Sequence, residues 1–295
     1  MNTSNTSSCG IRYTGLSIET APMVPMNELP SQVREYAMRR SEMSRASGFT
    51  MDYSKFASLN PAFGRIVCLT VGQTIGMDPA RPRIVTRSFV GDERSLLLEF
   101  SACFCGNSTV WVHYDGLSFD VPFILSRMRW LGIECSISRF GDTRRFQQDP
   151  HCDVREILSN WDHSRSIPLE VAALQAGLPS PKPKMHDPKV AARFLAGEIE
   201  TIARHRERAV ATAINLHRRL ILNKPAVNPE RCFWRSPSNI PCRIDFGEQQ
   251  ECDLLTSEDH LNAAWEESAR LGSPRIASEP CFGEREWDFA NLGAD

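Results

Sequence analysis

The chain has 295 residues, of which 41% are hydrophobic and 24% are charged, and this composition argues against a largely disordered protein. No apolar stretch reaches the roughly 18 residues that a membrane-spanning helix needs, so we expect no membrane association. The polar N-terminus, MNTSNTSSCG, lacks the basic and apolar regions of a signal peptide, which predicts an intracellular protein. The net charge of -2 neither favours nor excludes nucleic acid as a partner.

The sequence pattern of the first part of the chain predicts three strands. Residues 11–18 form the first strand, which we expect to end before the compact segment 19–22. Residues 65–71 form a strongly apolar run, and residues 83–89 alternate like its hairpin partner. The polar stretch between the first two strands resembles an insertion or a lid, with a short helical pattern at residues 32–43.

The second part alternates helices and strands. A helix is predicted after Asp92, a strand at residues 109–113 and a helix at residues 119–131. Several short helices follow, and the longest helical pattern covers residues 198–222. A hairpin followed by alternating helices and strands indicates an α/β fold with a mixed sheet.

The ends of the chain are predicted to lie outside this domain. We expect a disordered N-terminus at residues 1–10, one domain at residues 11–222 and a C-terminal extension at residues 223–295. The extension begins with several prolines, which favour an extended linker, and residues 257–271 suit one more helix.

The chain contains 10 cysteines, which raises the question of a metal or disulfide framework. Those near the C-terminus are too widely spaced for a zinc site, which needs close pairs. In a reducing compartment we expect most of them to be free thiols, with Cys68 and Cys103 in the core.

Three segments carry a resemblance to a nuclease family. They are LSIETAP at residues 16–22, YDGLSFDVPF at residues 114–123 and IARHRERAV at residues 202–210. In this order they resemble the D-I-E-T-x-P, N-G-x-x-F-D-x-P and I-x-x-Y-C-x-x-D-V runs of predicted 3′–5′ exonucleases similar to the exonuclease domain of family B DNA polymerases. The resemblance, to a branch of the DEDD superfamily, covers roughly residues 11–222, and the second segment is the most specific.

The resemblance implies a ribonuclease H-like mixed sheet flanked by helices, and a site for Mg²⁺ or Mn²⁺. In this superfamily four carboxylates hold two ions, which activate water and stabilise the departing oxygen. By this resemblance Glu19 and Asp120 would be catalytic residues and metal ligands. His205 occupies the position at which the family has the Tyr that orients the attacking water, and it is the third candidate catalytic residue.

Two of the four expected carboxylates are missing from this sequence. Ser17 stands where the family has its first Asp, and Ala209 stands where it has its last. A serine hydroxyl is a poor ligand for a hard cation, and alanine is none. Asp115 replaces an Asn of the pattern and is a further candidate ligand. Glu207 cannot stand in for Ala209, because two positions turn a helical side chain by about 200°.

Each site residue also has a structural interpretation. Glu19 fits a strand-end carboxylate that faces solvent, and Asp120 fits a helix N-terminus, where the dipole favours an acid. His205 lies among the arginines of residues 204–208, which is typical of a solvated helix face. Asp153 fits a helix cap.

The sequence supports three functions. The first, which we favour, is an exonuclease-like protein that is catalytically impaired or inactive and binds single-stranded nucleic acid, DNA or RNA, or a protein partner. The second is an active 3′–5′ exonuclease in which Glu19, Asp120 and a neighbouring acid hold one ion. The third is an interaction module of a replication or phage-like assembly, with the C-terminal extension as its contact surface. A retained fold does not by itself establish retained chemistry.

Overall fold

The structure is a computed structural model that describes residues 12–46, 52–75, 82–105, 109–181, 190–227 and 232–235. The expectations for residues 1–10 and 257–271 lie outside these ranges. Among the described helices, none combines the length and apolar character needed to cross a bilayer.

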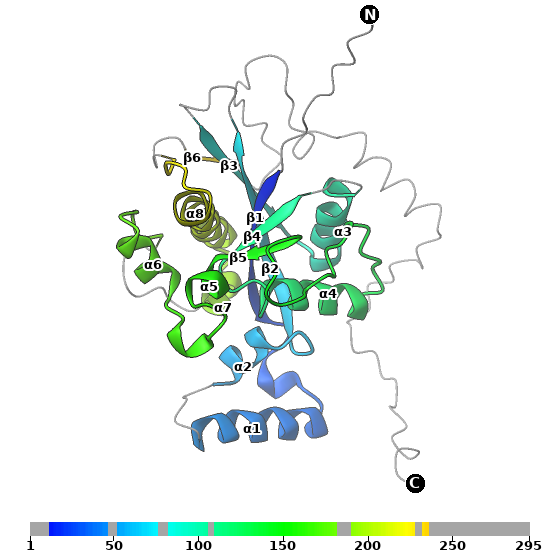
Figure 1. Ribbon diagram of the computed structural model, residues 1–295. Helices are drawn as coiled ribbons and strands as arrows, with labels where there is room; N and C mark the ends of the chain where they lie inside the picture. Colours follow the sequence, from blue (N-terminus) through cyan, green and yellow to red (C-terminus); the bar gives the residue numbers. More distant parts are fainter. Residues whose placement is uncertain are drawn as a thin grey trace, which may run out of the picture. The chain divides into compact units, whose positions relative to one another are not determined.

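A six-stranded mixed sheet, in the order β5-β4-β1-β2-β3-β6, forms the centre of the described residues (Figure 1). Its strands are β1 (Tyr13–Pro22), β2 (Gly64–Ile75), β3 (Arg83–Val90), β4 (Val110–His113), β5 (His151–Asp153) and β6 (Cys232–Arg235). Strand β2 is antiparallel to both β1 and β3, whereas β4 is parallel to β1, β5 to β4 and β6 to β3. This confirms the predicted α/β class and the ribonuclease H-like mixed sheet.

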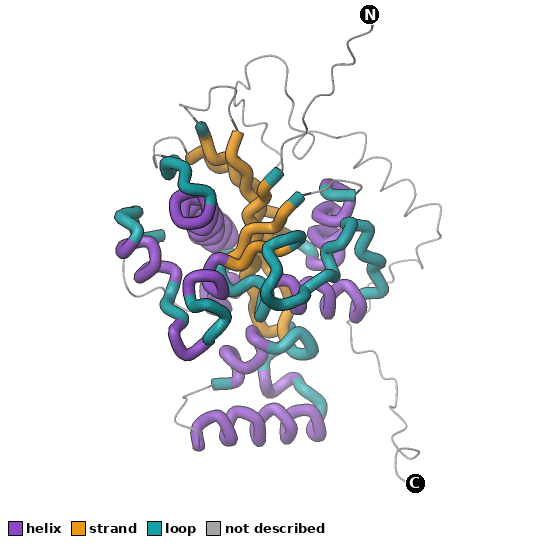
Figure 2. Tube along the Cα trace, viewed as in Figure 1, coloured by secondary structure: helices purple, strands orange, loops and turns teal. Residues whose placement is uncertain are grey.

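Helices cover both faces of the sheet (Figure 2). They are α1 (Ser31–Ala46), α2 (Tyr53–Leu59), α3 (Glu93–Cys103), α4 (Asp120–Trp130), α5 (Val154–Leu158), α6 (Leu169–Gln175), α7 (Val190–Leu195) and α8 (Ile199–Leu216). Helices α3 and α4 lie on one face and α8 lies on the other, while α2 contacts β1 and β2 near one end (Figure 1). Short 3-10 turns at Met26–Glu28 and His163–Arg165 connect elements, and a π-helical turn at His217–Ile221 follows α8.

The predicted end of the first strand at Ile18 is wrong, because β1 continues to Pro22. Between Glu19 and Thr20 the register with β2 shifts, which marks a β-bulge. A bulge adds an unpaired residue and breaks the alternation of side chains, so the sequence pattern stops there although the strand does not. The segment predicted to be compact is therefore the end of a strand.

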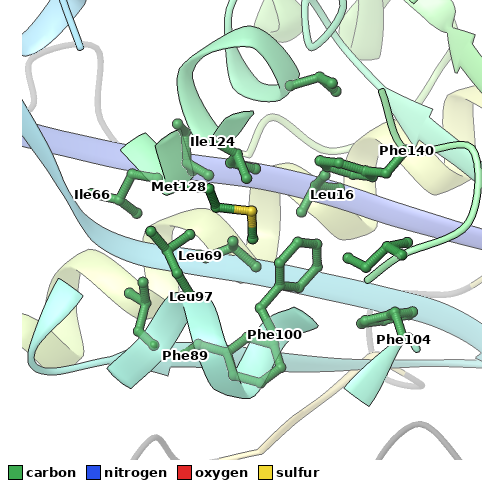
Figure 3. Close-up of a cluster of buried hydrophobic side chains, with 14 of the residues drawn as sticks. Leu16, Ile66, Leu69, Phe89, Leu97, Phe100, Phe104, Ile124, Met128 and Phe140 are labelled. Atoms are coloured by element: carbon green, nitrogen blue, oxygen red, sulfur yellow. The ribbon is translucent and has the colours of Figure 1, made fainter. Parts of the chain in front are cut away.

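The face covered by α3 and α4 holds the main hydrophobic core (Figure 3). Its aromatic rings meet at tilted or edge-on angles, with centroids 4.8 Å apart for Phe104 and Trp111 and 5.2 Å apart for Trp111 and Phe140. A buried ion pair, Arg127 Nη2 to Glu93 Oε2 at 2.7 Å, joins α4 to α3. Burying this pair removes both charges from water, and the hydrogen bonds between the two side chains offset part of that desolvation cost.

The opposite face is shaped by two glycines that pair across β1 and β2. Gly15 faces Gly72 in the register, and both lie under α8. A Cβ on Gly15 would lie 2.8 Å from Ile214 Cγ1, and a Cβ on Gly72 would lie 2.8 Å from Val210 Cγ1. Since such contacts are shorter than real side chains make, the two glycines allow α8 to rest almost directly on the sheet backbone.

We predict that Gly72→Ala lowers the free energy of unfolding by about 1–3 kcal/mol, because the added methyl group overpacks the interface with α8. Chemical denaturation would measure it. Gly141→Ala is the matched control, since nothing lies within 4 Å of a Cβ at that position. Equal effects of the two substitutions would contradict a tight contact between α8 and β2.

Candidate functional site

An open pocket of about 580 Å³ is lined by residues of β1, α2, α4 and α8. Ser17 and Glu19 come from β1, Asp120 from the start of α4, Arg206 from α8 and Lys55 from α2. Residues that are up to 189 positions apart in sequence meet here, as in the contact between Ser17 and Arg206. The structure therefore brings Ser17, Glu19 and Asp120 to one pocket, as the sequence predicts.

Glu19 forms an ion pair with Arg206. Glu19 Oε1 lies 2.8 Å from Arg206 Nε, and the two side chains are 13% and 20% exposed. The Nε–H group does not point well enough at the carboxylate to form a hydrogen bond, so the contact is mainly one of charge. The carboxylate therefore neither faces bulk solvent nor stands alone, because Arg206 lies against it.

Asp120 is buried at the N-terminus of α4 and reaches back to β1. Its Oδ1 accepts a hydrogen bond from the backbone N–H of Ile18 at 3.2 Å. Burial raises the pKa of Asp120 to about 7, and the nearby charge of Arg206 only partly opposes this rise. Asp120 therefore begins a helix, as its structural interpretation predicts, and it also lines the pocket.

Ser17 and His205 lie beside this ion pair. The Ser17 hydroxyl accepts a hydrogen bond from Arg206 Nη1 at 3.3 Å. His205 Nδ1 lies 3.6 Å from Glu19 Oε1, and the histidine side chain is only 14% exposed. The surface interpretation of His205 is therefore wrong. Ala209 is buried and does not line the pocket.

Asp115 lines the pocket but is engaged elsewhere. Its carboxylate forms an ion pair with Arg155 and accepts a hydrogen bond from the Ser118 hydroxyl. Asp153 is buried behind it and accepts hydrogen bonds from the backbone N–H groups of Asp115 at 2.9 Å and Leu117 at 3.0 Å. Asp153 also caps α5, which confirms the structural interpretation of this residue.

Glu207 lies between α8 and the sheet and does not line the pocket. Its side chain is 0% exposed and its Oε2 is 3.1 Å from Arg204 Nη1. Oε1 accepts a hydrogen bond from the Ser88 hydroxyl at 3.2 Å. This placement agrees with the expectation that Glu207 cannot replace an acid at Ala209.

Arg206 is a pocket residue that sequence reasoning missed. It was grouped with the arginines of a solvated helix face, yet it stands at the cysteine of the I-x-x-Y-C-x-x-D-V pattern. It also precedes Ala209 by three residues, and residues at that spacing share one face of a helix. Those two signals could have placed its side chain in the pocket.

The side chains present do not fit a two-ion centre. Within the described part of the chain, no three His, Cys, Asp or Glu side chains are grouped so that they could hold a metal ion. Such ions need several ionised oxygen ligands. Here Glu19 already faces an arginine, which leaves Asp120 as the remaining acid of the family pattern in the pocket.

Comparison with known proteins shows which protein family the chain matches. Residues 65–232, more than half of the chain, match the model of a family described as predicted 3′–5′ exonucleases related to the exonuclease domain of PolB. None of the curated proteins compared with the chain matches it. Among solved structures, the family B DNA polymerase from the hyperthermophilic archaeon Pyrobaculum calidifontis matches with 16% sequence identity and a TM-score of 0.47. That match covers 72% of this chain but only 24% of the polymerase chain.

We predict that Glu207→Gln stabilises the protein at neutral pH. Burial raises the pKa of Glu207 to about 7 although Arg204 and Arg208 oppose the rise. The protonated carboxyl of Glu207 therefore stabilises the folded protein fully at acidic pH. This stabilisation is lost as the pH rises from the pKa of the unfolded chain, about 4.5, through the pKa of the folded protein, about 7. Above that pH range the free energy of unfolding of Glu207→Gln should exceed that of the native chain by on the order of 1–3 kcal/mol. Urea unfolding at a series of pH values measures the difference.

Near pH 4 the two proteins should unfold alike, because glutamate is then protonated in both states. A constant difference at every pH would contradict the link to this carboxyl.

Proposed function

We propose that this chain, which belongs to the family of predicted 3′–5′ exonucleases related to the exonuclease domain of PolB, binds nucleic acid without hydrolysing it. The observation that carries this proposal is the pairing of Glu19 with Arg206 in the pocket. The acid that the family pattern retains on β1 is already neutralised by a side chain of α8.

The ligand set supports loss of hydrolysis. Metal-dependent hydrolysis of a phosphodiester uses ionised carboxylates to fix ions that activate water and stabilise the departing oxygen. Ser17 offers a hydroxyl, and Ala209 offers no ligand. Changes that only surround metal ligands already cost roughly 10- to 100-fold in affinity or activity, so loss of two ligands should cost more. Asp115 does not compensate, since it is paired with Arg155.

The pocket lining supports binding of single-stranded nucleic acid. Tyr114 and Phe119 both line it, and aromatic faces stack on bases without sequence preference. Lys55 supplies a cation at the α2 side of the pocket, where a backbone phosphate could be met. The positive charge of Arg206 is balanced by Glu19, so we assign binding mainly to stacking, with DNA and RNA both as candidate ligands.

A protein partner held by the C-terminal extension stays a prediction. Residues 228–231 and 236–295 lie outside the described residues, and among the described residues of the extension Cys232–Arg235 forms a strand, β6, beside β3. The domain boundaries at residues 11–222 and 223–295 and an intracellular location likewise stay predictions.

We predict that the native chain does not shorten 5′-labelled single-stranded DNA or RNA in Mg²⁺ or Mn²⁺. Ser17→Asp/Arg206→Ala/Ala209→Asp restores two carboxylates and removes the cation, and should produce shortening from the 3′ end. Denaturing gel electrophoresis over time measures both. The control is Glu19→Ala/Asp120→Ala.

Degradation by the native chain that this control abolishes would overturn the proposal. It would favour the alternative of an active exonuclease with a reduced carboxylate set.

We predict that single-stranded oligonucleotides bind with equal affinity in EDTA and in Mg²⁺, since the proposed contacts need no metal. Phe119→Leu keeps an apolar side chain but removes the stacking ring, and should weaken binding by about 1–3 kcal/mol. Fluorescence anisotropy measures the affinity. Phe146→Leu is the matched control, because Phe146 is an exposed aromatic residue that does not line the pocket. Equal losses from both variants, or no binding by the native chain, would contradict this site.

A further inference from the structure

The guanidinium of Arg206 contacts both of the β1 side chains that the family pattern makes acidic. Its Nε lies 2.8 Å from Glu19 Oε1, and its Nη1 donates a hydrogen bond to the Ser17 hydroxyl at 3.3 Å. Its Nη2 lies 3.2 Å from His205 Nδ1. All three nitrogens of one cation therefore contact residues of this site.

This position is held from both sides. On β1, Glu19 lies at the bulge that shifts the register with β2, and Ser17 is paired with Thr70 in the preceding regular part. On α8, Val210 is fixed against Gly15 and Gly72, one helical turn after Arg206. The glycine contact therefore fixes the backbone positions of α8 and β1 from which the Arg206 side chain reaches Glu19.

The chemistry of the neighbours suits a guanidinium better than a divalent ion. A serine hydroxyl accepts a hydrogen bond from an N–H group readily, but it is a weak ligand for a hard cation. A metal ion approaching Glu19 would meet the positive charge of a partly buried guanidinium, and like charges repel each other.

We infer that Arg206 is a built-in cation that takes the place of a divalent ion at Glu19 and excludes metal from the pocket. This inference rests on the proposed function of the same site and adds its cause: the loss of metal is enforced by a positive side chain as well as by missing ligands. The substitution at Ser17 belongs to the same arrangement, because a hydroxyl there accepts a hydrogen bond from the guanidinium.

The test separates exclusion by Arg206 from the lack of ligands. All variants carry Ser17→Asp, which restores one carboxylate. The comparison is between Ser17→Asp alone and the double variant Ser17→Asp/Arg206→Ala. The electron paramagnetic resonance signal measures free Mn²⁺, and bound Mn²⁺ is the difference from the total. In this background Arg206→Ala should tighten Mn²⁺ binding by at least about 10-fold, a change of the size seen when groups around metal ligands are altered.

Two further variants keep the result interpretable. Arg206→Gln removes the charge but keeps much of the side chain, and should tighten binding in the same direction if the alanine variant does not fold. Arg208→Ala is the matched control, since Arg208 is exposed on the same helix and does not line the pocket. This control should leave Mn²⁺ affinity unchanged.

Equal Mn²⁺ affinity with and without Arg206, in folded variants, would overturn the inference. So would tightening by Arg208→Ala as large as that by Arg206→Ala, since any lost arginine would then suffice. Neither result would overturn the proposed function, which fails only if the native chain degrades nucleic acid or does not bind it.

Discussion

The close approach of α8 to the sheet is the constraint on which the site depends. Gly15 and Gly72 pair across β1 and β2 and place no side chains of their own between these strands and the helix. Val210 fills the space above them, which fixes the rotation of α8 about its axis. With that rotation set, Arg206 lies over β1, and its long side chain reaches Glu19.

The pocket is thereby stabilised by a contact within the chain. In a metal-dependent nuclease, neighbouring carboxylates repel one another until cations bind them. Here that repulsion is relieved differently at each position. Ser17 and Ala209 remove charge, Arg206 balances Glu19, and burial raises the pKa of Asp120. On the proposal made above, the family fold is kept while the electrostatic reason for binding metal is largely gone.

Much of this fold could be predicted from sequence, because its elements follow strong local patterns. The apolar runs of β2 and β3 and the cap of α5 at Asp153 are examples. The end of β1 could not, since the bulge after Glu19 interrupts the alternation on which strand prediction depends. Helix α2 was also missed, because its seven residues are too few to show a clear helical period.

The site was predictable in part for a similar reason. Short motifs placed Glu19, Asp120 and Ser17 together, but they carry no information on which face of α8 meets the sheet. Arg206 and Arg208 look equivalent in a run of arginines, and only the glycine contact at Val210 and Ile214 distinguishes them. Asp115 looked like a candidate ligand because its pairing with Arg155, 40 residues later in sequence, is not visible in a local pattern.

An anomalous difference map from crystals of the native protein soaked in Mn²⁺ tests the central claim most directly. We expect no manganese peak at Glu19, and we expect electron density for the Arg206 guanidinium in contact with Glu19 and Ser17. A manganese peak between Glu19 and Asp120, with the arginine displaced from the carboxylate, would contradict it.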